Sequence, residues 1–166
     1  MRLLIRSLAL LTAAVLLAGC SFHLRGQAAM PFETLYLKAT NPGTQFISEL
    51  RRNLEANKVE LVDTAAQADV VLDIVAEIPD KQILSLSGSG RVNEFQLFYR
   101  VSLRAYDLNN NDVIPAEEIV MHSDFPYDDN NVLAMEGEET LLYQNMRSDM
   151  VQRIVRRLSR VKLKPR

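Results

Sequence analysis

Residues 92–106 read VNEFQLFYRVSLRAY, and apolar and polar side chains alternate along most of this stretch. This period of two residues is typical of a β-strand, in which successive side chains point to opposite faces of a sheet. The apolar face comprises Phe95, Leu97, Tyr99, Val101, Leu103 and Ala105. The other face carries Gln96, Arg100, Ser102 and Arg104, together with Phe98 and Tyr106. The pattern therefore predicts a sheet with one buried face and one wet, basic face.

Two strand patterns precede this stretch. The even-numbered residues of 70–78 are apolar, which predicts a strand with one buried face. Pro79 marks an edge, a bulge or an interruption, because proline cannot donate a hydrogen bond to a neighbouring strand, and residues 83–86 then resume the pattern. Residues 87–90 read SGSG, which predicts a flexible hairpin turn.

Two further strands complete the expected sheet. Residues 109–112 read NNND and predict a hairpin turn, after which residues 118–122 form the returning strand. Near the start of the domain, residues 35–37 predict a short apolar strand, which the Asn-Pro-Gly turn at 41–43 ends.

Two segments have the period of an amphipathic helix. Residues 44–55 predict a first helix that Thr44 caps, and residues 131–163 predict a long final helix. The apolar stripe of the long helix comprises Leu142, Met146, Met150, Ile154 and Leu158, joined by Leu141, Val151, Val155 and Val161. The order β, α, three strands, α predicts an α+β two-layer sandwich, in which two helices pack on one face of a four-stranded mixed sheet.

A short apolar run opens the chain. Arg2 and Arg6 precede apolar residues 8–17, which have the length of a secretory signal and are too few to span a bilayer. The run ends in Leu-Ala-Gly-Cys, with Cys20 the only cysteine, and this ending resembles the bacterial lipobox. We therefore expect a signal peptide at 1–19, an N-acyl and S-diacylglyceryl lipid on Cys20, and a tether at 20–31.

Residues 32–166 are then a single domain. Removal of the signal takes two arginines, so 17 basic residues face 21 acidic ones and the net charge of the mature chain is −4. That balance argues against nucleic-acid binding, which requires a basic excess or stripe. Ser21 follows the lipidated cysteine where an aspartate is typical of retention in the inner membrane, so we expect the periplasmic side of the outer membrane.

No catalytic constellation is recognisable in the sequence. The two histidines, His23 and His122, lie in unrelated segments and have no partner at metal-ligand spacing. Asp124, Asp128 and Asp129 lack the spacing and the glycine of a calcium loop, so a helix cap in a solvated loop is the better interpretation. We therefore predict a protein that binds rather than catalyses, with no metal and no cofactor apart from the covalent lipid.

Several stretches carry a family resemblance that covers essentially the whole mature chain. Residues 19–26 read GCSFHLRG, which is similar to the mature start of the LptE family of lipopolysaccharide-assembly lipoproteins. Four further stretches agree in order: ELRRNL at 49–54, EFQL at 94–97, DDNNVLA at 128–134 and IVRRL at 154–158.

The resemblance implies an outer-membrane lipoprotein that binds the β-barrel LptD one to one, plugs and helps assemble it, and assists delivery of lipopolysaccharide to the outer leaflet. It also implies lipopolysaccharide contacts near the turn between the second and third strands, at 87–90, and before the last helix. Arg91 lies at that turn, whereas residues 133–135 read LAM and offer no basic side chain. The alternative is an auxiliary lipoprotein subunit of another envelope transport complex.

The candidate binding residues lie in the predicted sheet and its loops. We expect Arg91, Arg100 and Arg104 to bind lipopolysaccharide, and Phe125 and Tyr127 to contact the barrel, because arginine and aromatic side chains are enriched at interface cores. The alternatives are that Arg100 and Arg104 only solvate the sheet face, and that the two aromatic rings pack beneath their own loop.

Overall fold

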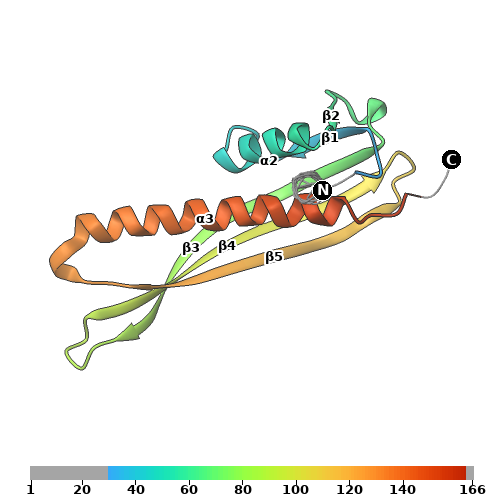
Figure 1. Ribbon diagram of the computed structural model, residues 1–166. Coiled ribbons are helices and arrows are strands. Elements are labelled where there is room, and N and C mark those ends of the chain that lie inside the picture. Colours follow the sequence, from blue (N-terminus) through green and yellow to red (C-terminus); the bar gives the residue numbers. More distant parts are fainter. Residues whose placement is uncertain (1–29, 164–166) are drawn as a thin grey trace, which may run out of the picture.

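The computed structural model describes residues 30–163, so the predicted signal peptide 1–19, Cys20 and most of the predicted tether lie outside the described residues. The described chain forms one sheet and two α-helices (Figure 1). Its elements, in order, are β1 (Thr34–Ala39), α2 (Gln45–Ala56), β2 (Glu60–Leu61), η1 (Ala65–Gln67), β3 (Val70–Leu86), β4 (Val92–Asp107), β5 (Asp112–Pro126), η2 (Asp129–Asn131) and α3 (Val132–Leu158).

The sheet has the strand order β2-β1-β3-β4-β5. β1 runs parallel to both β2 and β3, whereas β3, β4 and β5 form an antiparallel meander, so the sheet is mixed as predicted. It has five strands rather than four. The added strand, β2, contains only Glu60 and Leu61, and two residues are too few to show a strand period in the sequence.

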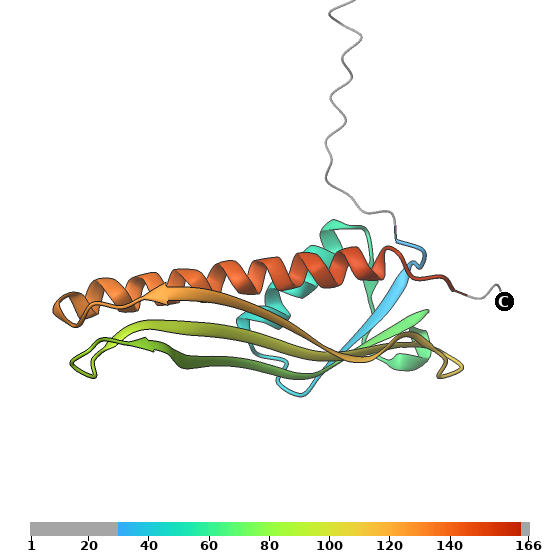
Figure 2. The same cartoon turned by 90° about the horizontal axis from the view of Figure 1, so that it is seen from below.

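Both helices pack on one face of the sheet, which confirms the two-layer architecture. Figure 2 shows α3 running along the sheet with α2 beside it at one end, and among residues 30–163 no α-helix covers the opposite face. The Thr44 hydroxyl accepts a hydrogen bond from the amide of Ile47 at 3.2 Å, so the predicted N-cap of α2 is confirmed.

The core lies between the helices and the sheet. The β4 residues predicted for the apolar face from Leu97 to Ala105 are buried, and Phe95 is partly buried at the end of that row. They meet Phe46, Ile47, Leu50 and Leu54 of α2 and Met146, Met150, Val151, Ile154, Val155 and Leu158 of α3. Leu141, which was predicted to join the apolar stripe of α3, is exposed instead.

β3 is one continuous strand through Pro79, which pairs with Tyr99 of β4. β1 covers β3 only as far as Ile74, so Pro79 lies on a free edge where no second neighbour needs its missing N–H. A bulge between Ile74 and Ala76 also inverts the alternation. Ile78, which was expected on the buried face, is consequently 45% exposed on the opposite one.

Within residues 30–163, no helix is both long enough and apolar enough to cross a membrane.

Candidate functional site

The β3–β4 hairpin forms the end of the molecule farthest from α2 (Figure 1). Its turn closes with a hydrogen bond from the Ser87 amide to the Arg91 carbonyl at 2.7 Å, and Gly90 has a φ of 80°, a conformation that glycine adopts without strain. Beside the turn, Ile83 and Leu86 are 58% and 56% exposed, and Leu84 is exposed as well. Exposed aliphatic side chains therefore surround the turn that carries Arg91.

The Arg91 side chain is exposed at this turn. Within residues 30–163, no carboxylate oxygen lies within 4 Å of its guanidinium nitrogens. An unpaired guanidinium beside exposed aliphatic carbons matches an amphiphile that has an anionic head and acyl chains. We call Arg91, Ile83, Leu84 and Leu86 the hairpin patch.

Arg100 and Arg104 lie on the helix-free face of β4, as predicted, and each has an acidic partner. Arg100 pairs with Asp80 at 3.2 Å and lies over the ring of Phe98, with 4.8 Å from Cζ to the ring centroid. Arg104 pairs with Asp112 at 2.5 Å and lies over the ring of Tyr106. Hydrogen bonds from Gln82 and Arg100 hold the pKa of Asp80 below its ordinary value, and the bond from Gln82 has the larger effect.

The helix-free face therefore carries more acidic than basic side chains, which corrects the expectation of a basic face from β4 alone. The neighbouring strands β3 and β5 supply the acids that pair with Arg100 and Arg104, which a single-strand pattern cannot reveal. The charged residues of this face include the basic Lys38, Arg100 and Arg104 and the acidic Asp73, Asp80, Glu94, Asp112, Glu118 and Asp124.

The structure does not bring the three predicted arginines together. Arg91 immediately precedes β4 and Arg100 lies nine residues after Arg91, a separation of roughly 30 Å at about 3.3 Å per residue. Arg104 lies farther still from the hairpin turn. Arg91 and the pair Arg100 and Arg104 are accordingly two separate surfaces.

The two predicted barrel contacts, Phe125 and Tyr127, differ in burial. Phe125 is the penultimate residue of β5 and is 0% exposed, so its ring belongs to the core and offers no surface to a partner. Tyr127 is partly buried, and its ring packs edge-on against Phe95 at 5.1 Å and against Phe125 at 6.4 Å. Phe125 therefore packs beneath its own loop, which was the alternative expectation. Of the two side chains, only that of Tyr127 remains partly accessible to a partner.

The acidic loop before α3 forms a cap. The Asp128 carboxylate accepts a hydrogen bond from the Asn130 amide at 3.0 Å and further bonds from the Asn130 and Asn131 side chains. These bonds lower the pKa of Asp128 from its ordinary value, and the bond from the Asn130 backbone amide contributes most. Within residues 30–163, no three metal-ligating side chains gather into a cluster.

A sequence model of the lipopolysaccharide-assembly family LptE matches residues 32–158. The chain belongs to this family. The LPS-assembly lipoprotein LptE of Yersinia pestis (strain Pestoides F) is 32% identical to it over 163 residues, which cover 95% of this chain and 77% of the relative.

Solved structures agree with this family assignment. The solution structure of an uncharacterized lipoprotein B from Nitrosomonas europaea is 39% identical, has a TM-score of 0.72, and is matched over 84% of this chain and 90% of that one. The crystal structure of the rare lipoprotein B from Shewanella oneidensis is 26% identical with a TM-score of 0.68, and the match covers 75% of this chain and 92% of that one. The α+β sandwich is thus shared with experimentally determined lipoproteins.

Reasoning from the sequence missed the aliphatic part of the hairpin patch. The signal that would have found it is the loss of alternation after Pro79. Ile83, Leu84 and Leu86 include two adjacent apolar residues, so at least one must face solvent in a strand that has a single buried face.

Proposed function

We propose that this protein is a lipid-anchored subunit of the outer-membrane machinery for lipopolysaccharide assembly. It plugs the β-barrel LptD, helps the barrel to assemble, and assists the delivery of lipopolysaccharide to the outer leaflet. The observation that carries this proposal is the family match, which spans 32–158 and so includes nearly the whole described domain. In this role the protein acts by binding, and its only covalent group is the lipid on Cys20.

The shape and the surface of the domain support a plug. α3 has 27 residues and is therefore about 40 Å long, which is close to the thickness of a bilayer with its headgroups. The helix-free sheet face carries paired charges of both signs, and the lumen of an outer-membrane barrel is polar and lined by water. A rod of this length with such a face suits a site along the axis of the barrel.

The hairpin patch supports a direct lipid contact. Lipopolysaccharide combines anionic head groups with acyl chains, and the patch combines Arg91 with the aliphatic side chains of Ile83, Leu84 and Leu86. Arg100 and Arg104 are already paired with carboxylates, so Arg91 is the arginine of the three that we assign to lipopolysaccharide. Arg100 and Arg104 are assigned to the wall of the barrel.

The experiment that tests the complex is purification of the tagged, lipidated protein from its own envelope in mild detergent. We expect a large outer-membrane β-barrel to copurify at a one-to-one ratio, and an untagged strain serves as the control. Recovery of the protein alone would overturn the plug. Recovery with subunits of an inner-membrane transporter would instead favour an auxiliary role in another envelope transport complex.

The lipid contact is tested by charge reversal at Arg91. Arg91→Glu should weaken binding of purified lipopolysaccharide to the detergent-solubilised protein at least fivefold, because a carboxylate then faces an anionic head group. Arg153→Glu makes the same charge change at an exposed position on α3, far from the hairpin, and is the matched control. Equal binding curves for the two variants would remove Arg91 from the site.

A further inference from the structure

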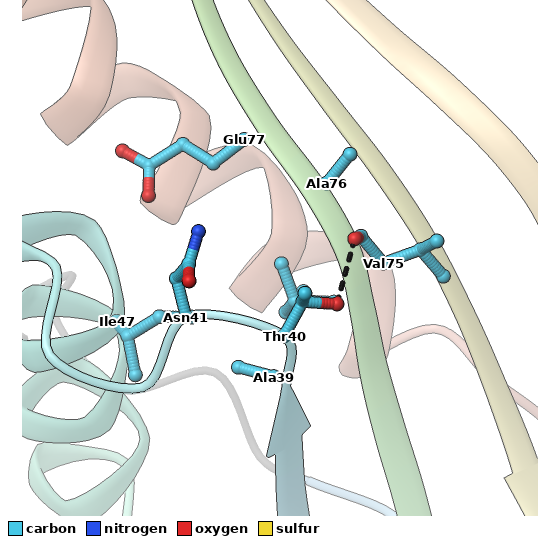
Figure 3. A pocket seen from close by; sticks show the side chains of 8 residues that line it. Ala39, Thr40, Asn41, Ile47, Val75, Ala76 and Glu77 are labelled. Atoms are coloured by element: carbon cyan, nitrogen blue, oxygen red, sulfur yellow. Dashed lines mark hydrogen bonds between the residues drawn. The ribbon is translucent and has the colours of Figure 1, made fainter.

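A pocket of about 230 Å³ opens at the edge of the sheet, at the point where β1 ends and β3 continues without it. Figure 3 shows the pocket between the end of β1, the first turn of α2 and the bulge of β3. Thr40 closes the end of the β1–β3 ladder, because its hydroxyl donates to the Val75 carbonyl at 2.9 Å. The pocket therefore lies beside the free edge of β3.

The wall of the pocket has an aliphatic part and a polar part. Ala39, Ile47, Ile74, Val75 and Ala76 form the aliphatic part. The polar part consists of the exposed Thr40 and Asn41 and of the Glu77 carboxylate, which projects to the α2 side of β3 (Figure 3).

Glu77 has one satisfied oxygen and one unsatisfied oxygen. Its Oε1 accepts a hydrogen bond from the Tyr99 hydroxyl at 2.5 Å, and burial raises the pKa of Tyr99, so this hydroxyl keeps its proton and remains a donor. Its Oε2 is buried and has no hydrogen-bond partner among residues 30–163. Leaving a buried carboxylate oxygen without a donor costs free energy, and a donor that reaches it gains correspondingly.

No basic residue among residues 30–163 forms an ion pair with the Glu77 carboxylate. On α3, Arg147 acts electrostatically on Tyr99 but pairs with Glu49 of α2 at 3.4 Å, and Glu49 also accepts from the Ser148 hydroxyl at 2.6 Å. Across residues 30–163, no lysine or arginine nitrogen lies within 4 Å of Glu77.

We propose that this pocket receives a basic side chain, lysine or arginine, from the protein partner. Both side chains have an aliphatic stem and a cationic head, and the pocket has an aliphatic wall that leads to a carboxylate. Its volume is several times the roughly 30 Å³ that one water molecule occupies and is below the range of pockets for drug-sized ligands, so it suits a single side chain. The free edge of β3 lets a partner segment approach alongside. This inference rests on the proposed function, because it requires a protein partner.

The test uses two tagged copies of the lipidated protein that compete for the partner in one envelope. Glu77→Gln keeps the volume of the side chain and an oxygen for the Tyr99 hydroxyl but removes the charge. We expect the variant to fall from an equal share of the purified complex to less than a tenth. Glu55→Gln, an exposed residue of α2 that loses the same charge, should keep its equal share.

A second measurement separates recognition from folding. The thermal midpoint of free Glu77→Gln should equal or exceed that of the wild type, because the substitution removes a buried charge that has no cation beside it. A variant that melts well below the wild type and is lost from the complex would assign Glu77 a structural role and overturn the proposal.

A photo-crosslinker at Thr40, on the rim of the pocket, identifies the occupant. The crosslinked partner peptide should contain a lysine or arginine whose replacement by alanine weakens the complex no further when combined with Glu77→Gln. Equal competition by Glu77→Gln in a complex that does contain the barrel would overturn this inference alone. If the wild-type protein recovers no protein partner, the proposed function and this inference both fail.

Discussion

Phe125 and Tyr127 are two residues apart, yet only Phe125 lies fully in the core. We predict that Phe125→Ala lowers the free energy of unfolding by about 3–5 kcal/mol, because it leaves a cavity at a fully buried ring. Tyr127→Ala should cost clearly less, since Tyr127 is partly exposed. Urea unfolding followed by circular dichroism measures both values. Equal losses for the two variants would contradict the assignment of Phe125 alone to the core.

Single residues were predictable where a local rule decides their environment. Thr44 was identified as a cap because a hydroxyl before an apolar helical pattern satisfies a free amide, and the structure confirms it. The environments of Ile78 and Phe125 were not predictable. The bulge between Ile74 and Ala76 decides which face of the sheet Ile78 occupies, and the extension of β5 as far as Pro126 places Phe125 in the core. Neither the bulge nor the end point has a marker in the sequence.

At the scale of elements, the Asp128 carboxylate caps η2, the short helical turn that leads into α3. The pKa of Asp128 is lowered in the folded chain, so the cap stabilises this segment fully above the ordinary aspartate value of 3.8 and is lost as the pH falls through the lower, folded value. We predict that amide exchange at Asn130 and Asn131 accelerates between about pH 4 and pH 2, beyond the intrinsic dependence of exchange on pH. Hydrogen exchange read by NMR measures this change.

The control for this titration is Asp128→Asn. Its amide oxygen still accepts from the Asn130 backbone but does not titrate in this range, so exchange in the variant should follow the intrinsic pH dependence alone. If the wild type and the variant gave parallel profiles from pH 6 to pH 2, the Asp128 carboxylate would have no part in ordering the start of α3.

Elements were predictable in proportion to their length and periodicity. The 12 residues of α2 and the 16 residues of β4 repeat their pattern often enough to be recognised. β2 was missed because its two residues become a strand only by pairing with Thr34 and Leu35, which are more than 20 positions away. Pro79 left three alternatives open, and the length of β1 decides among them, since β1 ends before it reaches Pro79.

At the scale of the whole molecule, the candidate surfaces combine residues from several strands. β4 alone predicted a basic face, and the acids that balance Arg100 and Arg104 come from β3 and β5. The Glu77 pocket likewise requires β1, α2 and β3 to meet. The family resemblance supplied the expected role from short motifs. Only the folded sheet shows that, of Arg91, Arg100 and Arg104, Arg91 is the one without a carboxylate partner.

We propose that a lipid on Cys20, which lies outside the described residues, holds this molecule at the membrane. We predict that Cys20→Ala, expressed behind a signal peptide that is cleaved without lipidation, incorporates no labelled palmitate and moves from the membrane to the periplasmic fraction. The physical reason is that stable anchoring needs at least two acyl chains, at about 0.8 kcal/mol per buried CH₂ group. Its far-ultraviolet circular dichroism should match that of the wild type, because residue 20 precedes the core.

The same variant separates anchoring from partner binding. If the barrel holds the domain by its protein surfaces, overexpressed barrel should return part of the unlipidated protein to the outer membrane, and a variant that adds Glu77→Gln should return less of it. Membrane fractionation at matched expression measures both proteins. Full membrane association of Cys20→Ala without palmitate or added barrel would show that the lipid is not the main anchor.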